Sequence, residues 1–343
     1  MTHKNPSSSS SSILPSSFKL SNVPVINQYE IGLPTGCEAT SLAQALQYLG
    51  LNVSPIQIAT MLKKEPFMFQ LPLPTSSLKS RDNDHPTSIT NNNTSRSDDG
   101  GVVITDSHPT SITTTTMNDV WYGGNPKRAF VGNPFSAVEG MGVYDEPLIE
   151  LVDHFFIPIL KKLYSIHPYN GNVNNKGSIN DGPKKVVKGV KRFLPPTLEW
   201  NSKNNALEKN HFQSILEYMY IHQVPVVIWC TLKMRESFHN SHETWMDYLN
   251  EEHCIEWKSP EHCVTLIGFE NYNNSSENKS VEKNEKNDSS SLPSVVIVND
   301  PDYGCEMRYD RKLFEKRFEE MGGMAFSFEF DECPLDQKKE SLL

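Results

Sequence analysis

The chain has 343 residues, 37% of them hydrophobic, and a formal net charge of −10 at pH 7. This acidic balance argues against a nucleic-acid or membrane partner, since both usually require a basic face. No apolar run approaches the roughly 18 residues of a membrane span, and the N-terminal residues lack the apolar core of a signal peptide. We therefore expect a cytoplasmic protein without a nucleic-acid or membrane partner.

The polar residues are concentrated in segments too poor in apolar side chains to offset the entropy cost of ordering. We predict a disordered tail over residues 1–17, a C-terminal tail over 332–343, and low-complexity insertions near 74–119, 169–189 and 271–293. The remaining periodic segments predict one domain over residues 18–331, because long loops add only slowly to the cost of chain closure.

The first predicted helix begins at Cys37 and ends before Gly50. Its apolar positions recur at i, i+3, i+4 and i+7, which is typical of a helix packed by one face: Leu42, Ala45, Leu46 and Leu49. Free N–H groups and the helix dipole in the first turn favour a thiolate at Cys37, an effect that Glu38 would partly oppose. Taken alone, such a cysteine fits a structural role as well as a catalytic one.

The elements that follow predict an α+β fold, with helices in the first half of the chain and an antiparallel sheet in the second. Two further helical stripes are Leu148, Leu151, Val152 and Phe155, and then Phe212, Ile215, Leu216 and Met219. Strand-like runs cover 224–231, 262–269, 295–298 and 324–330, with a helix near 310–321. We interpret the basic residues of 184–192 as the solvated edge of a loop rather than as a partner surface.

A nucleophilic thiol needs a base, a group that orients the base, and a donor for the oxyanion. His262 is the candidate base because it opens an apolar strand, a setting that the other histidines lack. Asp300 leaves the end of the next strand and can orient the imidazole, with Asn299 as a rival and turn chemistry as the alternative explanation. Gln28 follows an extended segment and can supply the oxyanion donor.

Six cysteines, spread through a long chain without a signal peptide, indicate reduced thiols rather than a disulfide framework. The pairs His253-Cys254 and His262-Cys263 permit a zinc interpretation, but adjacent residues of a strand point to opposite faces. We therefore predict neither a metal nor an organic cofactor, and we expect Cys230 and Cys263 in the core.

Several segments, in order, resemble the C-thirty-nine-like cysteine peptidases, which are soluble relatives of the bacteriocin-leader-processing peptidases in the papain-like superfamily. The similar segments are 23–28, 35–42, 125–132, 142–144, 225–229, 261–268 and 298–301. The resemblance implies a papain-like fold in which a helical half carries the cysteine and an antiparallel sheet carries the histidine and aspartate. It further implies Cys37 as nucleophile, His262 as base, Asp300 as its orienting group and Gln28 as oxyanion donor.

The predicted activity is thiol-dependent hydrolysis of a peptide or amide bond in a peptide or protein substrate. The long insertions and the lack of a fused transporter segment depart from the bacteriocin-exporting relatives, so we do not expect cleavage at a double-glycine leader. Two alternatives remain open. The same acyl-enzyme can pass to an amine or thiol, as in a transpeptidase, or the fold can serve as a peptide-binding module without catalysis.

Overall fold

The computed structural model describes residues 14–70, 120–166, 185–195, 211–239, 243–271 and 293–332. The predicted insertion near 74–119, the C-terminal tail after Glu332, and most of the other insertions and of the N-terminal tail lie outside these residues. The α-helices are α1 (Cys37–Tyr48), α2 (Pro55–Met61), α3 (Asp145–Leu151), α4 (Ile157–Ile166), α5 (His211–His222) and α6 (Arg311–Glu320). A π-helical turn, η2 (Val152–Phe156), joins α3 to α4, and a 3-10 turn, η3 (Leu232–Met234), follows β8.

An antiparallel sheet of seven strands forms the centre of the fold. Its order is β13 (Cys305–Asp310), β12 (Val295–Asp300), β11 (Glu261–Glu270), β8 (Val226–Thr231), β14 (Ala325–Glu332) and β7 (Lys185–Phe193), while β1 (Ser17–Lys19) pairs with the end of β11. Mixed helices and sheet agree with the predicted α+β class. Because β11 and β12 are neighbours, the strands that carry the predicted histidine and aspartate lie side by side.

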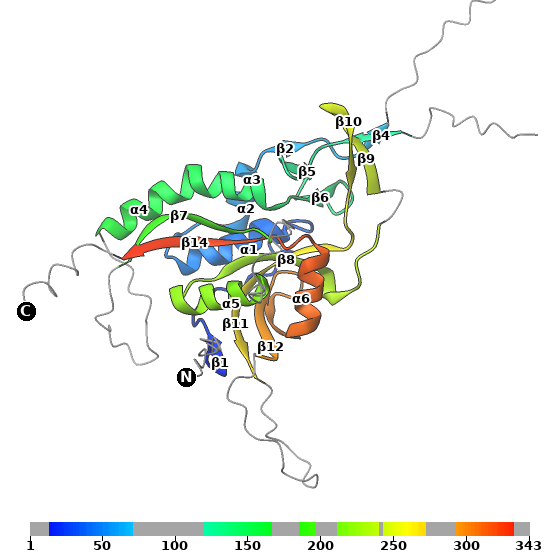
Figure 1. Cartoon of the computed structure of the whole chain (residues 1–343). Coiled ribbons are helices and arrows are strands. Elements are labelled where there is room, and N and C mark those ends of the chain that lie inside the picture. Colours follow the sequence, from blue (N-terminus) through cyan, green and yellow to red (C-terminus); the bar gives the residue numbers. More distant parts are fainter. Residues whose placement is uncertain are drawn as a thin grey trace, which may run out of the picture.

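Two hydrophobic cores fill the two faces of the large sheet, and strand alternation decides which residue enters which core. On β8, Val227 and Trp229 join α1 to α4 in one core, whereas Ile228 and Cys230 join α5 and α6 in the other. On β11, Cys263 enters the α1 core and Val264 the opposite one, and both predicted core cysteines are buried. Figure 1 shows α5 and α6 along one side of the sheet and α1, α3 and α4 along the other.

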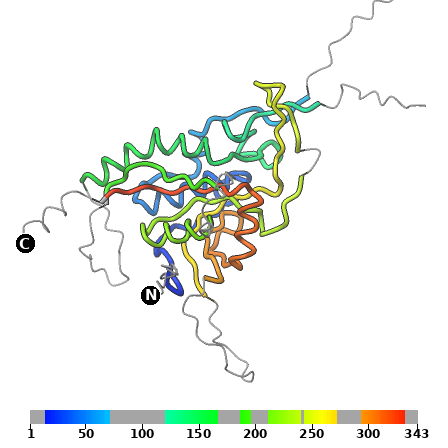
Figure 2. Tube along the Cα trace, in the orientation of Figure 1, coloured from blue at the N-terminus to red at the C-terminus, as the bar shows by residue number. Residues whose placement is uncertain are grey.

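Two small sheets lie at one end of the molecule. One has the order β10 (Asn250–Glu256), β9 (Thr244–Asp247), β4 (Trp121–Gly123), β3 (Phe69–Gln70), and the other the order β2 (Lys64–Glu65), β5 (Phe130–Gly132), β6 (Gly140–Gly142). Figure 2 shows that these segments, distant in sequence, meet in space. Arg128 ties them together, because its guanidinium bonds both Glu65 and Asp247, whose side chains are only 1% and 2% exposed.

Replacing Arg128 by Ala is expected to lower the free energy of unfolding by about 3 to 5 kcal/mol, since two buried carboxylates would lose their counter-charge. Arg128 also holds the pKa of Asp247 well below its usual range. A depressed carboxyl pKa stabilises the fold above the unfolded pKa near 4, and that contribution is lost as the pH falls toward the folded pKa. Urea unfolding of the wild type and of Arg128→Ala, measured at several pH values, tests both the loss of stability in the variant and its dependence on pH. Lys188→Ala, at an exposed pair with Glu329, should change stability by less than about 1 kcal/mol.

The α3 to α4 region departs from the predicted helical stripe. Leu148, Leu151 and Val152 are buried as expected, but Phe155 is 55% exposed and Phe156 is buried in its place. The cause is the π-helical turn, which adds a residue to one turn and rotates the following residues around the helix axis. The stripes of α1 and α5 carry no such turn, and all eight of their predicted apolar positions are buried.

The basic segment that we interpreted as a loop edge is a strand. Residues 185–193 form β7, the edge strand beside β14, so the predicted insertion near 169–189 runs five residues into regular structure. Lys188 is exposed and pairs with Glu329, while Val187 enters the core. Charged side chains on an exposed edge strand hinder pairing with other chains, which explains why this strand has a polar sequence.

Helices long and apolar enough to cross a bilayer do not occur among the described residues.

Candidate active site

Cys37 is the first residue of α1, as the sequence predicts, and its side chain is buried. Gly36 precedes it as the N-cap residue and packs closely on Leu33, so that a Cβ at Gly36 would lie 2.8 Å from Leu33 Cβ. This close turn delivers Cys37 to the end of the helix that packs against β11. Ser41 Oγ donates to Cys263 O at 3.0 Å, and Thr265 Oγ1 donates to Ser41 O at 3.0 Å, which fixes α1 on that strand.

His262 and Asp300 form a buried pair across neighbouring strands. His262 Nε2 lies 2.7 Å from Asp300 Oδ1, and both side chains are almost fully buried. Asp300 also accepts hydrogen bonds from the Asp302 backbone N–H at 2.9 Å and from the Tyr309 hydroxyl at 3.0 Å. These bonds, His262 first, hold the pKa of the Asp300 carboxyl below its usual value despite burial. An ionised Asp300 keeps the proton on Nε2 and leaves Nδ1 free to accept one.

Asn299, the rival for the orienting role, is used elsewhere. Its side-chain Nδ2 donates to Val23 O at 3.1 Å and to Pro24 O at 3.0 Å. The carboxylate of Asp300, and not this amide, therefore contacts the imidazole.

Gln28 lies close to the same strand end. Its backbone N–H donates to Pro301 O at 3.0 Å, so the segment before α1 is joined to the residue that follows Asp300. The side chain is buried, not an exposed polar group, and its Nε2 donates to Pro34 O at 2.9 Å. One amide hydrogen remains for another acceptor, which is what an oxyanion donor requires.

The thiol of Cys37 is directed to a carboxylate and not to the imidazole. Cys37 Sγ donates to Glu38 Oε2 at 3.4 Å. Among the described residues, no hydrogen bond joins Cys37 to His262. Glu261 and Cys263 face α1 from β11, while the His262 ring contacts Asp300 on the adjacent strand.

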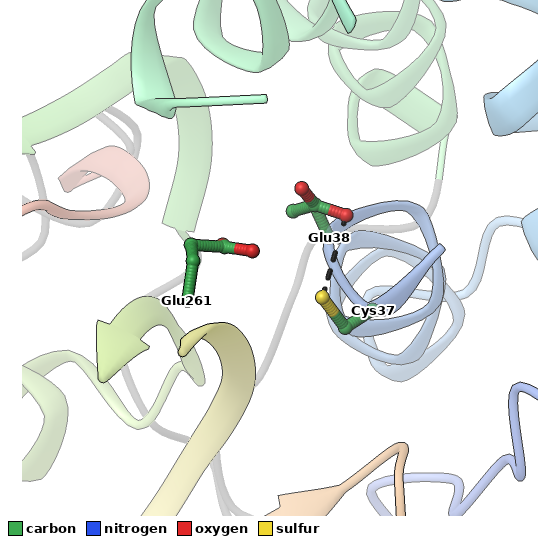
Figure 3. A group of neighbouring side chains, drawn as sticks. All are labelled: Cys37, Glu38 and Glu261. Atoms are coloured by element: carbon green, nitrogen blue, oxygen red, sulfur yellow. Dashed lines mark hydrogen bonds between the residues drawn. The ribbon is translucent and has the colours of Figure 1, made fainter. Parts of the chain in front are cut away.

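Two carboxylates converge at the thiol of Cys37 (Figure 3). Cys37 Sγ and a carboxylate oxygen from each of Glu38 and Glu261 lie within 4.8 Å of one another. Gly142 makes room for them, because a Cβ there would lie 2.6 Å from Glu38 Oε1 and 3.1 Å from Glu261 Oε2. One thiol and two carboxylates are also a possible ligand set for a divalent cation, but a cluster of acids without a further observation does not establish a metal site.

The environment corrects our expectation of a lowered thiol pKa. Burial raises the pKa of Cys37 well above its usual value, and the charges of Glu38 and Glu261 raise it further. The helix N-terminus does not compensate, because it provides only partial charge. Burial likewise raises the pKa of Glu38 to about 7 and that of Glu261 well above the ordinary carboxyl value. The resting site therefore holds a protonated thiol.

The raised pKa of Glu38 predicts a dependence of stability on pH. A carboxyl whose folded pKa exceeds its unfolded value, near 4.3, binds the extra proton in the native state. Its contribution is thus present at low pH and is lost as the pH rises from about 4 to 7, by about 1 to 3 kcal/mol. Urea unfolding across this range should show that loss in the wild type and not in Glu38→Gln. Parallel curves for the two proteins would contradict the assignment.

Sequence reasoning named Glu38 only as a group that opposes ionisation, and it did not single out Glu261 or Val143. The backbone N–H of Val143 donates to Glu38 Oε1 at 2.6 Å. Val143 and Glu261 lie in segments 142–144 and 261–268, which carry the family resemblance. That resemblance is the one sequence signal that could have pointed to these two residues.

Residues 20–167 match the model of the Peptidase_C39 like family, a range that contains Gln28 and Cys37 and ends before His262 and Asp300. A crystal structure from Bacillus anthracis, described as that of a candidate C39-like peptidase, is 22% identical and covers 92% of this chain and 99% of its own, with a TM-score of 0.47. Comparison with curated proteins finds no match. Over residues 20–167 the chain is therefore similar to the Peptidase_C39 like family.

Proposed function

We propose that the protein is a thiol hydrolase of peptide bonds. The observation that carries the proposal is the buried pair of His262 and Asp300, together with Cys37 at the start of α1, the helix that packs on the strand of His262. The match to the Peptidase_C39 like family over the segment that contains Cys37 supports peptidase activity. A buried imidazole held by a carboxylate and a thiol at a helix start are the groups that acyl-enzyme chemistry uses.

Catalysis begins when the thiol leaves Glu38 and turns toward the free Nδ1 of His262. His262 takes the proton, and the thiolate of Cys37 attacks the substrate carbonyl carbon. The N–H of Cys37, which has no carbonyl partner in the first turn of α1, and the amide of Gln28 donate to the oxyanion. His262 then protonates the leaving amine, and water hydrolyses the thioester. Hydrogen bonds of this kind are often formed only once substrate is bound.

The experiment is digestion of a mixed library of cellular peptides, with the new termini read by mass spectrometry. We expect cleavage products from the untreated protein, none after alkylation with iodoacetamide, and no effect of a metal chelator. Products that persist after complete alkylation of Cys37 would contradict a thiol mechanism. Full binding of library peptides without any cleavage would favour the peptide-binding module.

Hydrolysis and transfer share the acyl-enzyme, so the same assay is run with an added amine. An amide product that replaces the acid at millimolar amine would favour the transpeptidase alternative, whereas acid as the main product supports hydrolysis.

A further inference from the structure

The carboxylate of Glu38, beside Cys37, is held in position through both of its oxygens. Its side chain is fully buried, and both of its oxygens are engaged. Oε1 accepts the backbone N–H of Val143 at 2.6 Å, while Oε2 accepts the thiol of Cys37 at 3.4 Å. The N–H of Val143 and the space left by Gly142 fix the carboxylate at one orientation, in which Oε2 faces the sulfur.

The groups that act on the thiol from neighbouring elements are almost all acidic. Glu38 lies on α1, Glu261 and Cys263 face the thiol from β11, and each raises the pKa of Cys37. Tyr29, in the segment before α1, interacts with it as well. Within the described ranges, no Lys or Arg side chain forms an ion pair with Glu38 or Glu261. A positive charge on His262 would act on Glu38 in the opposite direction, because it lowers the pKa of that carboxyl.

We propose that Glu38 is a positioning residue that holds Cys37 as a thiol, hydrogen-bonded away from His262, for as long as the Glu38 carboxylate is charged. The inference rests on the proposed role of Cys37 as nucleophile and adds a regulation of that site. In the held state the proton stays on Sγ. When the hydrogen bond to Glu38 is released, Cys37 transfers its proton to Nδ1 of His262. The S–H bond breaks, an N–H bond forms, and the products are a thiolate and an imidazolium.

The consequence is a nucleophile that is restrained at and above neutral pH. The pKa of Glu38, about 7, places its ionisation at the point where a thiolate would otherwise begin to accumulate. Ionised Glu38 repels the thiolate and also accepts the thiol proton as a hydrogen bond, and both effects favour the thiol. Protonated Glu38, by contrast, can donate to a thiolate.

The test is the rate of alkylation of Cys37 by iodoacetamide at pH 7.5 in the wild type and in Glu38→Gln, with peptide mass spectrometry separating Cys37 from the other cysteines. The N–H of Val143 selects the amide oxygen of the new glutamine, so its NH₂ faces the sulfur and can donate to a thiolate. We expect alkylation to be at least about tenfold faster, which corresponds to a thiol pKa about one unit lower. Glu319→Gln, an exposed change of the same charge, should not alter the rate. An equal or slower rate in Glu38→Gln would overturn the proposal.

A second measurement needs no variant at Glu38 and covers the case in which Glu38→Gln does not fold. The Raman S–H stretching band of Cys37 is isolated by subtracting the spectrum of Cys37→Ala. We expect the band to shift between pH 5 and 8 as Glu38 ionises and accepts the thiol proton as a stronger hydrogen bond. An S–H band whose position stays constant over this pH range would contradict the proposed restraint of Cys37 by Glu38.

Both measurements report on the thiol without a substrate, so they separate this inference from the proposed function. Peptide cleavage by the wild type together with an unchanged alkylation rate in Glu38→Gln would contradict the restraint of Cys37 by Glu38 and leave the proposed hydrolase function supported. Faster alkylation of Cys37 in Glu38→Gln, together with no cleavage of any peptide by the wild type, would support the restraint by Glu38 and contradict the hydrolase function.

Discussion

Replacing Cys37 by Ala is expected to abolish peptide cleavage, with a fall in kcat of roughly 10⁶-fold, the order of loss observed when a catalytic nucleophile is removed. The reason is chemical, since the variant has no atom at this position that can form the thioester. Alanine is smaller than cysteine and is a good helix former, so α1 should be retained. The measurement is turnover of any peptide that the wild type cleaves, together with circular dichroism to verify folding.

The matched control is Cys254→Ala, which removes an exposed thiol on β10. It should keep the activity of the wild type and its sensitivity to iodoacetamide. Full activity in Cys37→Ala would rule out the mechanism, whereas loss of activity in Cys254→Ala would show that a different thiol matters.

Replacing Asp300 by Ala is expected to lower kcat by about 10² to 10⁴-fold, the range of a general-base contribution. Without the carboxylate, His262 loses the partner that keeps its proton on Nε2 and that stabilises the imidazolium. Asp300→Asn should lose much less. The Asp302 N–H, 2.9 Å from Oδ1, would select the amide oxygen at that position, and an oxygen there still accepts the Nε2 proton.

The pH profile distinguishes this positioning role from a structural one. Asp300→Asn removes the negative charge beside His262, so the acid limb of kcat/KM should move to lower pH while the fold remains intact. Equal losses for Ala and Asn with an unmoved profile would contradict the orienting role of Asp300.

Much of the scaffold of this site could be predicted from the sequence. In α5 the period of 3.6 reports directly on burial, because this helix has one core to face, whereas residues 37–46 of α1 are all buried and its stripe does not mark a single buried face. The relation of His262 to Asp300 was also accessible, since an antiparallel neighbour brings the end of one strand beside the start of the other. These predictions depend on local patterns and on pairing rules that act over short stretches of chain.

Other features depend on packing that no local pattern reveals. Phe155 fits a helical stripe, and only the π-helical turn of η2 moves it to the surface. The strand β7 has a basic sequence because it is an edge, and an edge looks like a polar loop when its partner β14 is far away in the sequence. The small sheets likewise combine segments that lie up to about two hundred residues apart.

The thiol environment illustrates the same limit in chemical terms. A cysteine at a helix start predicts a lowered pKa only where the helix end is the dominant influence. Here the packing of β11 and of the Gly142 turn against α1 buries Cys37 together with Glu38 and Glu261, and burial with two carboxylates reverses the direction. The residues around Cys37 in the sequence predict neither the burial of its side chain nor the approach of Glu261, which lies more than two hundred residues away.

The most direct test of the account is to trap the acyl-enzyme. The protein is mixed with N-acyl dipeptide p-nitrophenyl esters, quenched in acid within milliseconds to seconds, digested and mapped by mass spectrometry. The account predicts a thioester mass increment on the peptide that carries Cys37, slow to form in His262→Ala. Turnover of the esters without any adduct on Cys37, or with the adduct on another residue, would contradict Cys37 as the nucleophile.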